Sequence, residues 1–295
     1  MNWPAAAALL CSVPLTVVAQ AQRDTFGTLP PDRNKPIPSK AEIVAAWQKR
    51  QDAVKTLRFA WVEQQVHPRG WLPNPRFPEP ERASIPALLK DRRYTVSKSL
   101  SVDGDRMRYA FEMDRKEESD LGVGRHYSYV SVFDGHVGSA RLTSLTTSPP
   151  PAVRQVRTRV DAQNLDTRAI LMALRPLDPV MGHQLMDRAV PNLGRRFYKG
   201  RSTMILEERH DPSGWKTSLW IEPERGFLVS RYRVAFEQWF MVNIDVDYAA
   251  DPRWGWIPTG WRVSERLADG SMRLVSDAKV SSYSINLPIG SNEFR

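Results

Sequence analysis

The sequence predicts a mainly β protein with a minor helical part. We expect a single curled antiparallel sheet, or an incomplete β-barrel, with helices covering its concave face. Many segments alternate apolar and polar residues with the two-residue period of a strand. Several are joined by Asp-Gly pairs, which are typical of tight hairpin turns and therefore of antiparallel neighbours. Helical spacing is confined to a few places, so the strand–helix alternation of a parallel sheet is absent. A sheet of this many strands must curl.

Residues 1–21 are predicted to be a secretory signal peptide. The apolar run from Ala5 to Val18 is short for a membrane span, and Ala19-Gln20-Ala21 has the small-x-small pattern of a signal-peptidase site. Cleavage near Ala21 would place the protein in the periplasm or outside the cell. It would also remove Cys11, the one cysteine of the chain. A mature chain without cysteine suits an oxidising compartment and has no disulfide framework.

The folded part is expected to begin at residue 39. Residues 22–38 are rich in proline and are predicted to be a flexible linker, and residues 39–295 are predicted to form one domain. Ser39 and Glu42 have the spacing of a capping box, which marks the start of a helix. Ile43, Trp47, Val54 and Leu57 then recur at helical spacing, so we expect one amphipathic helix of about five turns.

Strand signals start where this helix is expected to end. Leu57, Phe59 and Trp61 point to one side of an alternating segment. The proline-rich stretch 67–90 that follows is incompatible with a central strand and is predicted to be a loop insertion. Such a long loop is either a functional flap or an insertion without a role, and both interpretations stay open.

The rest of the chain reads as hairpins with one helical interruption. Asp103-Gly104, Asp134-Gly135 and Asp269-Gly270 mark turns. Between the later hairpins, Arg168–Leu174 has a helical pattern that Pro176 stops, and a second short helical piece is expected at Met181, Leu185 and Met186. The strand around Val242, Ile244, Val246 and Tyr248 alternates with polar residues, which predicts one buried and one wet face.

No residue pattern indicates catalysis or a metal centre. None of the five histidines stands at zinc-ligand spacing from another. Asp245 and Asp247 share a strand face, but the additional oxygen ligands of a calcium loop are missing. Glu207-Glu208 could supply one glycosidase carboxylate but does not supply two placed ones. Two Ser-x-x-Lys matches, Ser213–Lys216 and Ser276–Lys279, fall in turn or strand segments, where this spacing does not bring the side chains together. We therefore predict no catalytic residue, metal ion or cofactor.

The net charge of +9 bears on possible partners. A basic surface attracts nucleic acid, but a secreted protein without a nucleic-acid motif is not expected to bind it. Anionic envelope surfaces, such as lipid headgroups or acidic cell-wall polymer, are better candidates. A generic excess of solubilising arginine and lysine is the competing interpretation.

Four segments resemble the LolA-type periplasmic lipoprotein-carrier superfamily, which also includes lipoprotein acceptors, lipid-binding mycobacterial relatives and an envelope stress sensor. The helix from Ala41 to Gln51 leads into Leu57–Gln64, much as these proteins open. Three further segments are similar to family elements: Tyr129–Gly135, Asn164–Pro176, and Ile285–Ile289 with Phe294 as the closing strand. The resemblance implies an incomplete antiparallel barrel with helices as a lid over an apolar cavity. It also implies non-covalent binding of acyl chains without enzymatic activity.

We therefore expect a secreted or periplasmic protein that holds lipid or lipoprotein acyl chains. Each buried CH₂ would contribute about 0.8 kcal/mol to binding. An envelope stress sensor or protein-interaction module of the same fold, and an enzyme acting on cell-wall polysaccharide, are the alternatives. The residues expected to line the cavity are equally suited to an ordinary core; they are Trp47, Phe59, Trp61, Tyr109, Phe111, Ile244 and Val246.

Overall fold

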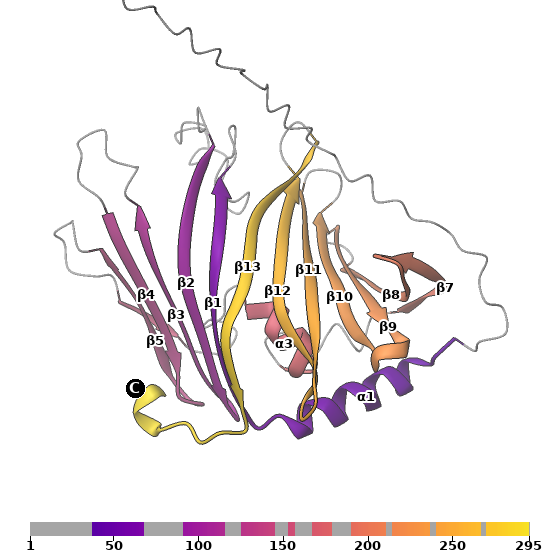
Figure 1. Ribbon diagram of the computed structural model, residues 1–295, viewed down its shortest axis with the longest axis horizontal. Coiled ribbons are helices and arrows are strands. Elements are labelled where there is room, and N and C mark those ends of the chain that lie inside the picture. The colour runs from indigo at the N-terminus through magenta and orange to yellow at the C-terminus, as the bar shows by residue number, and fades with distance from the viewer. Residues whose placement is uncertain are drawn as a thin grey trace, which may run out of the picture.

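The protein is built on one antiparallel sheet of thirteen strands that does not close into a barrel. The computed structural model describes residues 37–67, 91–115, 125–144, 153–156, 167–178, 190–210, 214–236, 240–266 and 270–294. The mainly β prediction is confirmed, and Figure 1 shows the strands side by side in a curved wall. The predicted signal peptide, almost all of the predicted linker, the loop insertion beyond residue 67 and the second helical piece lie outside these residues.

The first strand lies in the middle of the sheet. Strand β1 (Thr56–His67) pairs on one side with β2 (Arg92–Asp103) and on the other with β13 (Met272–Ile285). One half of the sheet continues from β2 through β3 (Arg106–Arg115), β4 (Arg125–Phe133) and β5 (Gly138–Ser144) to the edge strand β6 (Val153–Val156). The other half runs inward from the edge strand β7 (Val190–Tyr198) to β13, through β8 (Arg201–His210), β9 (Trp215–Glu222), β10 (Leu228–Phe236), β11 (Phe240–Asp251) and β12 (Gly255–Arg266).

The predicted Asp-Gly turns have the backbone geometry that their residues require. Gly104, between β2 and β3, has a φ of +56°, and Gly135, between β4 and β5, has a φ of +106°. Only glycine adopts these values without steric cost, so the two turns are fixed locally by the sequence.

Helix α1 (Lys40–Ala53) begins as predicted and ends earlier than predicted. Ser39 and Glu42 form the reciprocal bonds of a capping box. The helix stops at Ala53 because Val54 is extended and Leu57 already belongs to β1. Asn286 fixes this end: its side-chain amide donates to the Ala53 carbonyl (2.7 Å), and its side-chain oxygen accepts from the backbone of Lys55 (2.7 Å). A residue distant in sequence thus satisfies groups that a helix end leaves unpaired.

Helix α3 (Arg168–Leu174) matches the predicted segment and is buried on all sides. Ala169 to Leu174 are each at most 1% exposed. The helix packs against β10 and β12, and its side chains belong to the same core as those of β1, β3 and β11. Figure 1 shows α3 against the central strands, whereas α1 runs along one end of the sheet.

The chain leaves the sheet after Ile285, so the predicted closing strand through Ile289 is wrong beyond its first residue. Asn286 has a φ of +57°, which breaks the extended conformation, and its side chain caps α1 instead. The following short helix η4 (Ser291–Phe294) places Phe294 against Val132 and Ile289. A tertiary contact has replaced continued strand pairing.

Candidate functional site

The strand residues predicted to line a cavity share one face of the sheet. Phe59 and Tyr109 both stand opposite Leu100 of β2, one on each side of it. In the adjacent row, Trp61 and Phe111 flank Lys98 in the same way. Directly opposed residues of antiparallel strands project to the same side, so these side chains form neighbouring rows.

The other half of the sheet joins this face through tryptophan. Val246 of β11 stands opposite Trp261 of β12, and the rings of Trp261 and Trp61 meet edge to face with centroids 5.3 Å apart. Ile244 lies two residues before Val246 and therefore points the same way. Trp47 approaches from α1 and donates its indole hydrogen to the Phe227 carbonyl (2.7 Å). We call the surface formed by these residues the inner face.

In this structure the inner face is packed against protein. Tyr109 is 0% exposed, Trp61 and Ile244 are 1% exposed, and the core that holds them also contains every residue of α3 from Ala169 to Leu174. Phe111 is the exception, because it is only partly buried. Its ring stacks on that of Tyr129 with centroids 5.2 Å apart. These residues therefore lie together in one core, and their contact with a ligand stays a prediction.

One row of the inner face runs across five strands. It consists, in order from β4 to β13, of Tyr129, Phe111, Lys98, Trp61 and Val280. Tyr129, Phe111 and Val280 are partly buried, whereas Trp61 and Lys98 are almost completely buried. The fully buried core thus borders a more accessible part of the row. We call the rings of Phe111 and Tyr129 in this part the aromatic platform.

Sequence reasoning missed a buried ion pair in the same place. The Lys98 ammonium lies 2.6 Å from Oε2 of Glu63, and the two side chains are 2% and 1% exposed. Oε1 of Glu63 accepts hydrogen bonds from Ser276 (2.6 Å) and Gln65 (2.9 Å). The signal was present in the alternation of β2, where Lys98 occupies the buried phase between Val96 and Leu100.

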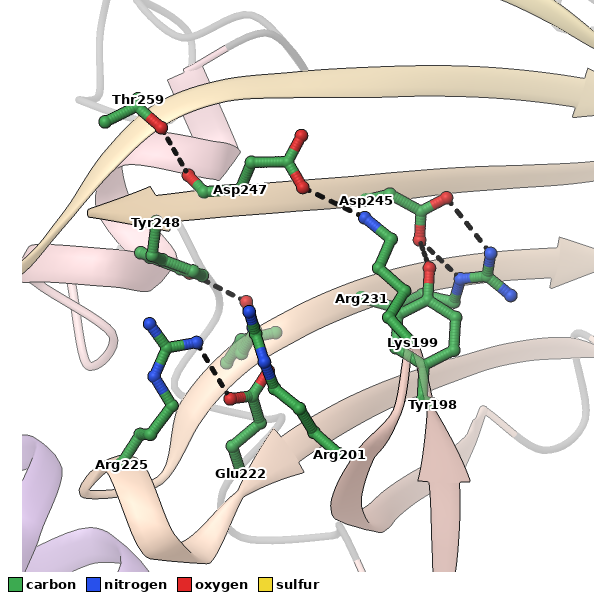
Figure 2. Close-up of polar contacts among 11 residues, drawn as sticks. Tyr198, Lys199, Arg201, Glu222, Arg225, Arg231, Asp245, Asp247, Tyr248 and Thr259 are labelled. Atoms are coloured by element: carbon green, nitrogen blue, oxygen red, sulfur yellow. Dashed lines mark hydrogen bonds and ion pairs between the residues drawn. The ribbon is translucent and has the colours of Figure 1, made fainter. Parts of the chain in front are cut away.

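The opposite, outer face carries a second charged group. Asp245 accepts hydrogen bonds from Arg231 (2.6 and 3.0 Å) and from the Tyr198 hydroxyl, while Asp247 pairs with Lys199 (3.1 Å). Figure 2 shows Tyr198 and Lys199 reaching toward these carboxylates from the β7–β8 hairpin. Asp245 and Asp247 share one strand face as predicted, but both are engaged by cations of the protein.

The pKa of Asp245 lies below its ordinary value. Burial disfavours the charged carboxylate, but the hydrogen bond and charge of Arg231 and the hydrogen bond from Tyr198 outweigh that effect. Asp245 is therefore held as an anion inside a protein-only contact. Sequence reasoning did not single out Tyr198, although Lys199-Gly200 is a turn dipeptide whose two residues both have positive φ (+49° and +75°).

A third charged group lies near the end of β9. Glu222 pairs with Arg225 (3.0 Å) and Arg201 (3.3 Å), as Figure 2 shows. The Arg225 guanidinium also stacks over Trp256, 3.3 Å from the ring centroid. These contacts join the ends of β8, β9 and β12 and account for the buried Glu222 carboxylate.

The remaining candidates for chemistry do not converge. Glu207 pairs with Lys216 (2.7 Å), whereas its neighbour Glu208 is buried among the inner-face strands, so the adjacent carboxylates point to opposite sides. Ser276 faces Glu63, whereas Lys279 is exposed. Among the residues that the structure describes, no group of His, Cys, Asp and Glu could hold a metal ion. In the same part of the chain, no helix combines the length and apolar character of a membrane span.

Comparison with solved structures gives a likeness of fold. No family model matches the chain, and no curated protein sequence matches it. The structure is similar to the crystal structure of a DUF1329 family protein from Desulfovibrio piger, with a TM-score of 0.50. The match covers 88% of this chain and 98% of that chain at 13% sequence identity. At this identity the likeness concerns the fold alone.

Proposed function

We propose that this chain is a non-enzymatic binding protein of the periplasm or extracellular space that holds lipid or lipoprotein acyl chains on its inner face. The observation that carries the proposal is the stacked, partly buried pair of Phe111 and Tyr129. It continues the buried aromatic row that contains Trp61. An alkyl chain bound along this platform would move out of water and into contact with the aromatic rings. This transfer contributes about 0.8 kcal/mol to binding for each CH₂ group.

A resemblance in sequence segments also supports this function. The segments that resemble LolA-type carriers include those that form α1, β1, the end of β4 and α3. We infer that α1 and α3 serve as the cover over the concave face that this resemblance implies. Because α3 packs against β10 and β12, an acyl chain that extended from the platform across the inner face to these strands would have to displace part of α3.

Lipid extraction and ligand uptake test the proposal. Protein purified from an envelope fraction should release acyl lipid detectable by mass spectrometry, and delipidated protein should take up a fluorescent acyl ester. The variant Phe111→Ser should reduce uptake by about tenfold, because it removes the platform. Asp247→Asn, which changes an exposed carboxylate on the outer face, should leave uptake unchanged. Absence of both bound lipid and uptake would rule out this function.

A further inference from the structure

The buried pair of Glu63 and Lys98 joins neighbouring strands, and Ser276 of β13 also binds its carboxylate. Strands β1 and β2 pair in unbroken register from Thr56 opposite Asp103 to His67 opposite Arg92. Two buried charges gain little over apolar side chains of similar size, because desolvation offsets their attraction.

Lys98 of the pair lies beside the proposed acyl platform. Lys98 stands between Trp61 and Phe111 in the aromatic row, and Phe111 continues into the partly buried platform with Tyr129. A chain lying on that platform would bring its polar end to the ammonium group. The four-carbon stem of lysine lets the ammonium turn toward such a group, whereas Ser276 and Gln65 hold the Glu63 carboxylate in place.

The charge balance of the pair decides which polar end fits. Glu63 and Lys98 together are neutral, and the inner face around them is largely apolar. An ester or amide carbonyl can accept a hydrogen bond from Lys98 without adding charge. An ionised carboxylate would add a second negative charge close to Glu63 in a medium where charges are weakly screened. A free fatty acid would thus be disfavoured although its alkyl chain is the same.

We propose that the Glu63–Lys98 pair is the polar anchor of the acyl site and selects neutral, ester- or amide-linked acyl chains over free fatty acids. This inference rests on the proposed function and specifies its ligand class. Acyl groups in such linkages occur in glycerolipids and in acylated proteins. The pair therefore distinguishes a protein that receives intact lipid or lipoprotein from one that scavenges fatty acid.

A matched pair of probes tests the selection. We would measure the binding of palmitate and methyl palmitate carrying the same fluorophore, at a pH where palmitate is ionised. The wild-type protein should bind the ester at least about tenfold more tightly than the acid. The variant E63Q leaves a lone cation and should reverse the preference. The double variant E63Q/K98M has neither the ammonium donor nor the carboxylate, so its preference for the ester should be smaller than that of the wild type. Lys199→Met, which removes an outer-face lysine, should keep the wild-type ratio.

The outcomes separate this inference from the proposed function. Binding of both probes by the wild-type protein with equal affinity would overturn the anchor and leave acyl binding standing. A ratio unchanged in E63Q would also overturn it. If the wild-type protein binds neither probe, both the anchor and the proposed function are wrong. Equal affinities in the wild-type protein would overturn the anchor even if a variant failed to fold.

Discussion

Tyr198 on the edge strand β7 donates a hydrogen bond to Asp245 on β11, although β8, β9 and β10 lie between these strands in the sheet. The contact is possible because the tip of the β7–β8 hairpin crosses the outer face. Arg231 completes it, since its guanidinium binds Asp245 and lies 4.4 Å from the centroid of the Tyr198 ring. The edge strand β7 is thereby bound to the central strand β11. This contact reduces the freedom of the edge strand to pair with other chains.

Replacing Tyr198 by Phe should destabilise the protein by about 2 kcal/mol, because a hydrogen bond to a buried carboxylate is lost while the ring is kept. Urea unfolding monitored by tryptophan fluorescence measures the change. Asp247→Asn is the control: the side chain of Asp247 is 54% exposed, so loss of its contact with Lys199 should change stability much less. If both variants lowered the free energy of unfolding by the same amount, the hydrogen bond of Tyr198 would contribute no more to stability than the exposed contact of Asp247.

Stability should fall in acid partly because of Asp245. Its folded-state pKa is below the ordinary value of 3.8, so its contribution is complete above that pH and is lost as the pH falls through the lower folded-state value. In Asp245→Asn the free energy of unfolding should be lower at neutral pH and should decline less steeply on acidification. Parallel curves for the variant and the wild type would exclude Asp245 as a source of the acid sensitivity.

Arg175 should be essential for the junction between the helices. Its Nη1 donates to the Val54 carbonyl at the end of α1 (3.0 Å), and its Nε binds Asp178 (3.0 Å), whose side chain is 0% exposed. Arg175→Met removes the cation beside a buried carboxylate and should cost about 3–5 kcal/mol. The double variant Arg175→Met with Asp178→Asn should recover part of that loss in chemical denaturation. No recovery would mean that the bond to Val54 carries the whole effect.

Gly260 should not tolerate a side chain. A Cβ there would lie 2.6 Å from the backbone oxygen of Ala278 on β13. Gly260→Ala should therefore separate β12 from β13 locally and cost about 1–3 kcal/mol. Gly290→Ala is the matched control, because a Cβ at that position meets nothing within 4 Å. Thermal unfolding of both variants checks the difference, and similar melting temperatures would contradict it.

Much of the fold could be predicted because its signals are local. The capping box at Ser39, the turn at Gly104 and the helix at Arg168–Leu174 each depend on a few adjacent residues. The shared face of the predicted lining residues also followed from strand alternation, which has a period of two wherever a strand forms. The β7–β8 hairpin was missed because its turn is Lys199-Gly200 rather than Asp-Gly.

The candidate site shows where local signals end. Alternation placed Phe59 and Trp61 on one side, but it could not show that α3 packs against that side. It assigned Lys98 to a buried phase of β2 without revealing the carboxylate beside it, because Glu63 lies on a different strand. A partner for a buried charge is a property of the assembled sheet and not of either strand.

The sequence by itself determined many of the strands, the Asp-Gly turns and which residues of those strands face the core. These follow from side-chain alternation and from backbone preferences that act over a few residues. The tertiary structure decided that β1 pairs with β13, that Asn286 ends α1, and that Glu63 meets Lys98 among the aromatic residues. Such contacts join residues far apart in the chain, and they form only when the burial of a whole face offsets the entropy of bringing those segments together.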